Sequence, residues 1–121
     1  MSHPNEFIDF VLEQMAVIGK PRARAMFGGH GIYQGEIIFA IIVDDRLYFK
    51  VGATTKAGFE ARGLKPFTYE SRGKLVAMQY YEAPPEVFDE AEAMREWASK
   101  ALNSAMRARK SKKAKTAPAA R

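Results

Sequence analysis

Hydrophobic residues recur at helical spacing near both ends of the chain. Close to the N-terminus they predict an amphipathic helix over residues 5–18, with Asn5 as its N-cap and Gly19 at its end. Close to the C-terminus a stripe at intervals of three and four residues predicts a long helix, whose inward face is formed by Met94, Trp97, Ala98, Ala101, Leu102 and Ala105. Trp97 is the largest of these side chains and is expected to anchor the helix.

Between these helices the pattern changes to strand spacing. It predicts five strands and, over residues 54–61, a short helix; the strands cover residues 23–33 (interrupted by the glycines of 28–31), 37–43, 47–51, 67–70 and 75–81. Residues 37–43 are apolar throughout, as in a central strand that is covered on both faces or shielded by oligomerisation. We therefore expect an α+β fold, a five-stranded antiparallel sheet flanked by N-terminal, short middle and long C-terminal helices.

Composition narrows the class of protein. A chain of 121 residues is the size of one domain. The absence of cysteine excludes disulfides, cysteine metal sites and thiol nucleophiles. The N-terminal residues lack the pattern of a secretory signal, and the longest uncharged apolar run is too short to span a membrane. These features favour a soluble, cytoplasmic protein without a membrane partner.

Charge divides the chain into two parts. Residues 1–106 contain twelve Lys and Arg against fourteen Asp and Glu, a balance of −2. Residues 107–121, the basic tail, contain seven Lys and Arg and no acid. We expect a folded domain over residues 1–106 and a tail that is disordered or a frayed extension of the last helix. The tail is either a solubilising segment or a contact for nucleic-acid phosphates through Arg107, Arg109, Lys110, Lys112, Lys113 and Lys115.

The glycine-rich segment at residues 28–31 resembles a phosphate loop only superficially. A strand follows it, whereas a phosphate loop needs a helix whose N-terminus points at the phosphate. The better interpretation is a turn or bulge that requires positive φ or close backbone approach. His30 has no metal-ligating neighbours at suitable spacing, and no serine has an evident base partner. We therefore predict no catalytic residues, no metal site and no cofactor.

Aromatic residues are more numerous than one sheet face needs. Most belong in the core, but some must lie on the other face, where exposed rings favour a protein interface. The set is Tyr33, Tyr48, Phe49, Phe67, Tyr69, Tyr80 and Tyr81. Homodimerisation through that face and docking of a protein partner are the two alternatives.

Several motifs together resemble a known family. They are RAMFGGHGIY at residues 24–33, FA at 39–40, DRLYFK at 45–50, PFTY at 66–69, PEV at 85–87 and WA at 97–98. In this order and spacing the chain resembles the N-terminal domain of the TfoX/Sxy family over roughly residues 5–106. The resemblance implies a secretion-chaperone-like α+β domain of a bacterial cytoplasmic protein. It also implies a link to the regulation of competence genes, acting with an activator of the cyclic-AMP receptor type.

Full-length members of that family carry a second, helical domain. This chain has the basic tail in its place, so we expect a stand-alone N-terminal domain. The leading hypothesis is a non-enzymatic regulatory module that contacts a protein partner, such as a transcription regulator. The alternatives are nucleic-acid association through the tail and a small-molecule pocket near residues 28–31. The candidate interaction residues are Met26, Phe27, Gly28, Gly29, His30, Gly31, Tyr33, Tyr48 and Tyr69.

Overall fold

The computed structural model describes residues 6–26 and 28–116, with side chains up to Lys110. The helical elements are α1 (Glu6–Gln14), the 3-10 turn η1 (Met15–Ile18), α2 (Lys56–Ala61), the 3-10 turn η2 (Pro85–Phe88) and α3 (Ala91–Thr116). The strands are β1 (Arg22–Met26), β2 (Gly29–Gln34), β3 (Ile37–Val43), β4 (Arg46–Lys50), β5 (Pro66–Ser71) and β6 (Lys74–Glu82). Asn5, the predicted N-cap, lies outside the described residues.

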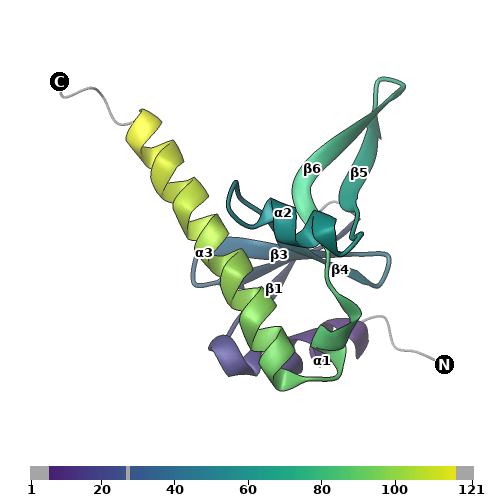
Figure 1. Cartoon of the computed structure of the whole chain (residues 1–121), viewed down its shortest axis with the longest axis vertical. Coiled ribbons are helices and arrows are strands. Elements are labelled where there is room, and N and C mark those ends of the chain that lie inside the picture. Colours follow the sequence, from purple (N-terminus) through teal and green to yellow (C-terminus); the bar gives the residue numbers. More distant parts are fainter. Residues whose placement is uncertain (1–5, 27, 117–121) are drawn as a thin grey trace.

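The strands form one antiparallel sheet in the order β1-β2-β3-β4-β6-β5, which confirms the α+β class. Figure 1 shows α3 crossing over the sheet, while the β5–β6 hairpin extends away from it. The neighbouring β4 and β6 pair over only three residues, Tyr48 to Lys50 against Tyr80 to Glu82. The hairpin therefore stands out from the sheet as an arm.

The sheet has six strands, so the prediction of five was wrong. Residues 22–34 form a hairpin, in which Met26 pairs with Gly29 and Arg22 pairs with Tyr33. Gly28 has a φ of 64° and lies in the turn, while the remaining glycines of the motif are strand residues. The chain reverses where the sequence suggested only an interruption, because Gly28 adopts the left-handed conformation that a tight turn requires.

Two other tight turns join strands that the sequence predicted. Asp44 and Asp45, between β3 and β4, have φ values of 53° and 57°. Positive φ at both central residues is the mark of a type I′ hairpin turn, which Asp tolerates better than most residues. The hairpin arm turns in the same way, with positive φ at Arg72 and Gly73.

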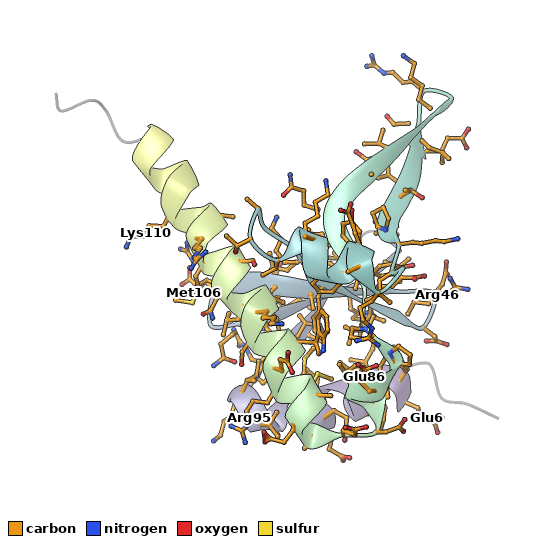
Figure 2. The ribbon with its side chains drawn as sticks, in the orientation of Figure 1. Glu6, Arg46, Glu86, Arg95, Met106 and Lys110 are labelled. Atoms are coloured by element: carbon orange, nitrogen blue, oxygen red, sulfur yellow. The ribbon has the colours of Figure 1, made fainter. Side chains whose placement is uncertain are left out.

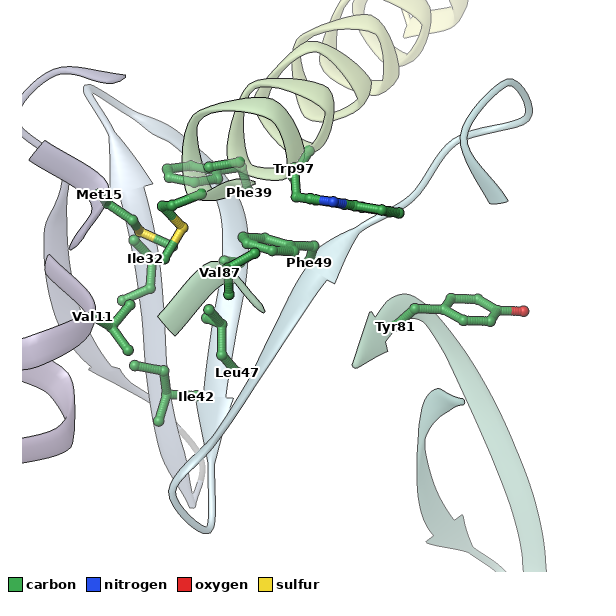
Figure 3. Packing of buried hydrophobic residues seen from close by; sticks show 14 of the residues in the cluster. Val11, Met15, Ile32, Phe39, Ile42, Leu47, Phe49, Tyr81, Val87 and Trp97 are labelled. Carbon is green, nitrogen blue, oxygen red and sulfur yellow. The ribbon is translucent and has the colours of Figure 1, made fainter. Parts of the chain in front are cut away.

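The main core lies between one face of the sheet and the helices. The predicted stripe of α3 is confirmed, because Met94, Ala98 and Ala101 are fully buried and Trp97 is 8% exposed. The Trp97 ring meets Phe59 of α2 edge to face, with 4.9 Å between ring centroids. Figure 3 shows how strand residues such as Phe39 and Phe49 pack beneath α3. Burial of these side chains supplies the hydrophobic stabilisation of the fold.

Helix α3 continues to Thr116, well past the end of its apolar stripe. Over residues 107–116 the structure places the tail in this helix, which corresponds to the second of the two alternatives from the sequence, an extension of the last helix. Its Ala, Arg and Lys residues have high helix propensity and extend a helix that the core already fixes. Residues 117–121 lie outside the described residues. None of the helices in the described part of the chain is long and apolar enough to cross a membrane.

Candidate functional site

The sheet has a second apolar cluster on the face opposite the helices, which we call the open face. Ile41, Tyr48 and Tyr80 are buried there, and Ile38, Val43 and Phe67 pack against them. All six residues belong to strands, whereas the main core also draws on the helices. Within the described residues, this cluster is therefore shielded by the sheet's own side chains.

A β-bulge explains how β3 supplies both faces. The pairing of β2 with β3 shifts between Ile32 and Tyr33, so that Phe39 is an extra residue in β3. Phe39 and its neighbour Ala40 both lie in the main core, while Ile38 and Ile41 lie in the open-face cluster. An uninterrupted apolar run is needed because each face of this central strand is covered by apolar side chains.

The open face is hollowed into a groove of about 330 Å³. Its lining comes from β1, β2, β3, β5 and β6 and consists of Met26, Gly29, His30, Ile38, Ile41, Val43, Phe67, Tyr69, Met78 and Tyr80. Three of these side chains are exposed although they are large and apolar or aromatic: Met26 (44%), Tyr69 (44%) and Met78 (38%). The groove is thus an accessible, mostly apolar surface that spans the sheet and its arm.

The glycines of β2 shape the floor of this groove. Neither Gly29 nor Gly31 has positive φ, so close approach is the reason for glycine at both positions. A Cβ on Gly29 would overlap the carbonyl oxygen of Ile42. A Cβ on Gly31 would stand 2.7 Å from Ile38 Cδ1 and 2.9 Å from Met26 Sδ. The missing side chains leave room for Met26 and Ile38 to fold over the strand.

Positive charge flanks the groove. Arg22 and Arg24 of β1 pair with the open-face residues Tyr33 and Gly31. The Arg24 guanidinium lies 5.4 Å from the centroid of the Tyr33 ring, and Lys50 Nζ lies 5.2 Å from that of Tyr80. Such contacts attract a cation to the face of an aromatic ring and hold it beside the apolar surface.

Tyr80 links the groove to this basic flank. Burial raises the pKa of its phenol to about 12, and the nearby Tyr33 adds to the shift. The phenol is neutral at physiological pH, so Lys50 contacts Tyr80 as an uncharged aromatic ring. The groove consequently presents apolar and cationic chemistry to whatever contacts it.

The structure brings several of the predicted interaction residues together. Met26, Gly29, His30 and Tyr69 line the groove, and Gly31 lies beneath the Met26 side chain. Tyr33 lies at the basic flank, and Tyr48 is buried beneath Phe67 with 5.2 Å between ring centroids. Gly28 is a turn residue, and Phe27 lies outside the described residues.

His30 occupies a different position from its glycine neighbours. It pairs with Ile42, a residue of the main core, so strand alternation directs its side chain away from the face of Gly29 and Gly31, and His30 borders the groove through its main chain. Within the described residues, no group of three His, Asp or Glu side chains is placed to hold a metal ion. The apolar lining of the groove and the cations beside it define the site.

Sequence reasoning missed Ile38, Ile41, Val43 and Met78 as site residues. The signal for the three β3 residues was the apolar run Ile37–Val43, in which some side chains must face away from the main core. Met78 precedes Tyr80 by two residues in β6, so both lie on one face of that strand.

Comparison with known proteins places the chain in a family. The TfoX N-terminal domain model matches residues 13–105. The chain belongs to the TfoX N-terminal domain family. A similar protein is DNA transformation protein TfoX1 of Aliivibrio fischeri (strain ATCC 700601 / ES114), which is 31% identical over 94 residues. These residues are 77% of this chain and 43% of TfoX1, so the chain spans less than half the length of that relative.

The TfoX match contains the whole groove, from Met26 to Tyr80. It ends at residue 105, where the apolar stripe of α3 also ends. The basic part of α3 thus lies beyond the TfoX N-terminal domain as the family model defines it.

Proposed function

We propose that this TfoX N-terminal domain is a non-enzymatic interaction module in transcriptional regulation. It acts by docking an apolar segment of a partner protein, flanked by acidic residues, into the open-face groove. The observation that carries the proposal is the groove itself, which has exposed Met26, Tyr69 and Met78 side chains on a face that lacks helices among the described residues. Met is well suited to such a surface because its flexible side chain adapts to the shape of a partner.

The positive charge of the open face indicates that the partner carries acidic residues. The open face carries four cations and one carboxylate on strands β1 to β4 and on the part of β6 that pairs with β4. These residues are Arg22, Arg24, Arg46, Lys50 and Glu82. The carboxylate of Glu82 is already 3.9 Å from Arg46. A partner with acidic residues beside its apolar anchors would complement this surface and be steered towards it.

The same charge argues against a second copy of the chain as occupant. Two open faces placed together would bring one set of cations against another, which is unfavourable near a desolvated interface. A small molecule is also a weaker match, because ligand pockets combine apolar walls with several convergent polar groups. A protein segment needs mainly apolar contact area with charged flanks, which the groove provides.

We propose the regulatory role because of the family to which the chain belongs. A relative named as a DNA transformation protein is consistent with control of genes for DNA uptake, and we extend that role to this chain as part of the proposal. A partner that is itself a transcription regulator would allow the groove to act without a base-reading element of its own.

Transcript profiling of a strain in which the groove is altered tests this function. Met78→Glu places a charge in the groove, and Leu75→Glu places the same charge on an arm residue that is 78% exposed. We expect Met78→Glu to reproduce the transcript changes of a full deletion and Leu75→Glu to match the wild type, at equal protein levels by immunoblot. A deletion without transcript changes, or a Met78→Glu strain like the wild type, would refute the proposal.

A further inference from the structure

The end of α3 carries a concentration of positive charge that the groove does not use. After Glu96 no acidic residue follows in the chain, and residues 107–115 contain six Lys and Arg. Residues 107–116, which we call the α3 extension, are helical and continue the helix that the core anchors through Trp97 and Ala101. Figure 1 shows this end of α3 extending past the sheet.

The described cations of the extension are accessible to solvent. Arg107, Arg109 and Lys110 are all exposed, and Figure 2 shows Lys110 on the part of α3 beyond the sheet. Arg109 lies 3.8 Å from Glu36, whose side chain is 88% exposed, and Arg107 donates a hydrogen bond to Thr54. An exposed ion pair at this distance is weak and exchanges readily for another anion. The extension therefore keeps a surplus of positive charge.

We propose that the α3 extension binds duplex DNA through its phosphates, without reading the base sequence. The six cations of residues 107–115 span eight residue steps, a length of about 12 Å of helix. An α-helix fits the major groove, so cations on such a helix can reach the phosphates that border it. Duplex DNA carries one negative charge per about 1.7 Å of its axis, which is close to the spacing of positive charge along the extension.

The composition of the extension distinguishes DNA from an anionic membrane. Helices that lie on membranes pair their basic residues with an apolar face that enters the acyl region. Beyond Met106 the extension contains no large apolar residue, only Ala, Ser and Thr between the cations. It also lacks the Asn and Gln side chains that pair with adenine, although Arg can contact guanine. Electrostatic, sequence-independent binding to phosphates is the mode that these residues support.

This inference goes beyond the proposed function, because it concerns the other side of the fold and needs no occupant in the groove. If both hold, the groove would select a protein partner while the extension contributes DNA affinity of its own. Each can fail without the other.

Fluorescence anisotropy with a labelled 20-base-pair duplex of arbitrary sequence, at several salt concentrations, tests the inference. If all six cations contact phosphates, affinity should fall on the order of 10³-fold between 50 and 200 mM salt. Arg107→Gln/Arg109→Gln/Lys110→Gln removes three of them with little change in helix propensity, and should lower the slope of log K against log salt by about three. The control is Lys56→Gln/Lys65→Gln/Lys74→Gln, three exposed cations elsewhere, which should leave the slope unchanged.

The outcomes are distinguishable. Parallel titration with vesicles that contain anionic lipid should show no binding that depends on the extension. Binding to the vesicles in place of DNA would overturn the proposal, and so would an equal loss of DNA affinity in the two triple variants. Binding that is confined to duplexes of one base sequence would also overturn it. Circular dichroism confirms that each variant retains the helical content of the wild type.

Discussion

Gly31 lies directly beneath the thioether of Met26, and a Cβ at Gly31 would stand 2.9 Å from Met26 Sδ. The sequence motif that identifies the family is thereby connected to the groove. The glycine leaves a space in β2, and the exposed Met26 side chain folds across it to form part of the lining. We infer that this part of the motif is constrained by the shape of the groove, whereas Gly28 is constrained by the turn.

The glycines of β2 should respond differently to alanine. At Gly29 the added Cβ meets the main-chain oxygen of Ile42, which cannot move without disturbing β3, so we expect a loss of about 1–3 kcal/mol in unfolding free energy. At Gly31 the added Cβ meets only side-chain atoms, which can shift. We therefore expect the unfolding free energy to fall by less than about 1 kcal/mol. Urea unfolding of the two variants measures the difference.

Gly58 supplies the control for these substitutions. It lies within α2, and nothing is within 4 Å of a Cβ built on it. Gly58→Ala should therefore stabilise the chain by about 0.5–1 kcal/mol through helix propensity. Equal losses at Gly29 and Gly31 would contradict the distinction between main-chain and side-chain contacts.

The pattern of the sequence predicted much of the fold but not the groove. The α3 stripe and the Asp44-Asp45 turn were predictable, because burial and tight turns leave local signatures. The hairpin at Gly28 was not, because several adjacent glycines do not show which one adopts positive φ. The groove depends on the position of the β5–β6 arm at the edge of the sheet. That position joins Phe67 to Tyr48, a contact that periodicity alone does not predict.

Trp97 should be the most costly side chain of α3 to remove. It is almost completely buried and meets Phe59 edge to face, so Trp97→Ala should lower the unfolding free energy by about 3–5 kcal/mol. Leu75→Ala, at a residue 78% exposed, should change it by less than about 0.5 kcal/mol. Denaturant unfolding checks both values, and a small loss for Trp97→Ala would show that α2 and α3 are not held together through this contact.

Acid should weaken the fold through Glu86. Arg62 donates two hydrogen bonds to this carboxylate, of 2.7 and 2.8 Å, and they lower its pKa from the usual 4.5 to about 2. Because the pKa is lower in the folded state, the pair stabilises the fold above pH 4.5, and this contribution is lost as pH falls from about 4.5 to about 2. Glu86→Gln should therefore flatten the decline of the urea midpoint in this range.

The control for Glu86 is Glu92→Gln, which removes the same charge from an exposed position on α3. That variant should keep the wild-type decline between pH 4.5 and pH 2. If Glu86→Gln and the wild type lose stability in parallel, the hydrogen bonds of Arg62 do not contribute to acid sensitivity.

The most direct test of the central claim is the affinity of the partner for the groove. A photo-cross-linking residue at Met78, with one at Leu75 as control, would capture the occupant in cells, and titration of the purified partner would then give its Kd. We expect a cross-link from position 78 to an apolar segment with acidic flanks, and at least about tenfold weaker binding of the partner to Met78→Glu but not to Leu75→Glu. Capture of only a second copy of the chain, or equal affinity for both variants, would contradict it.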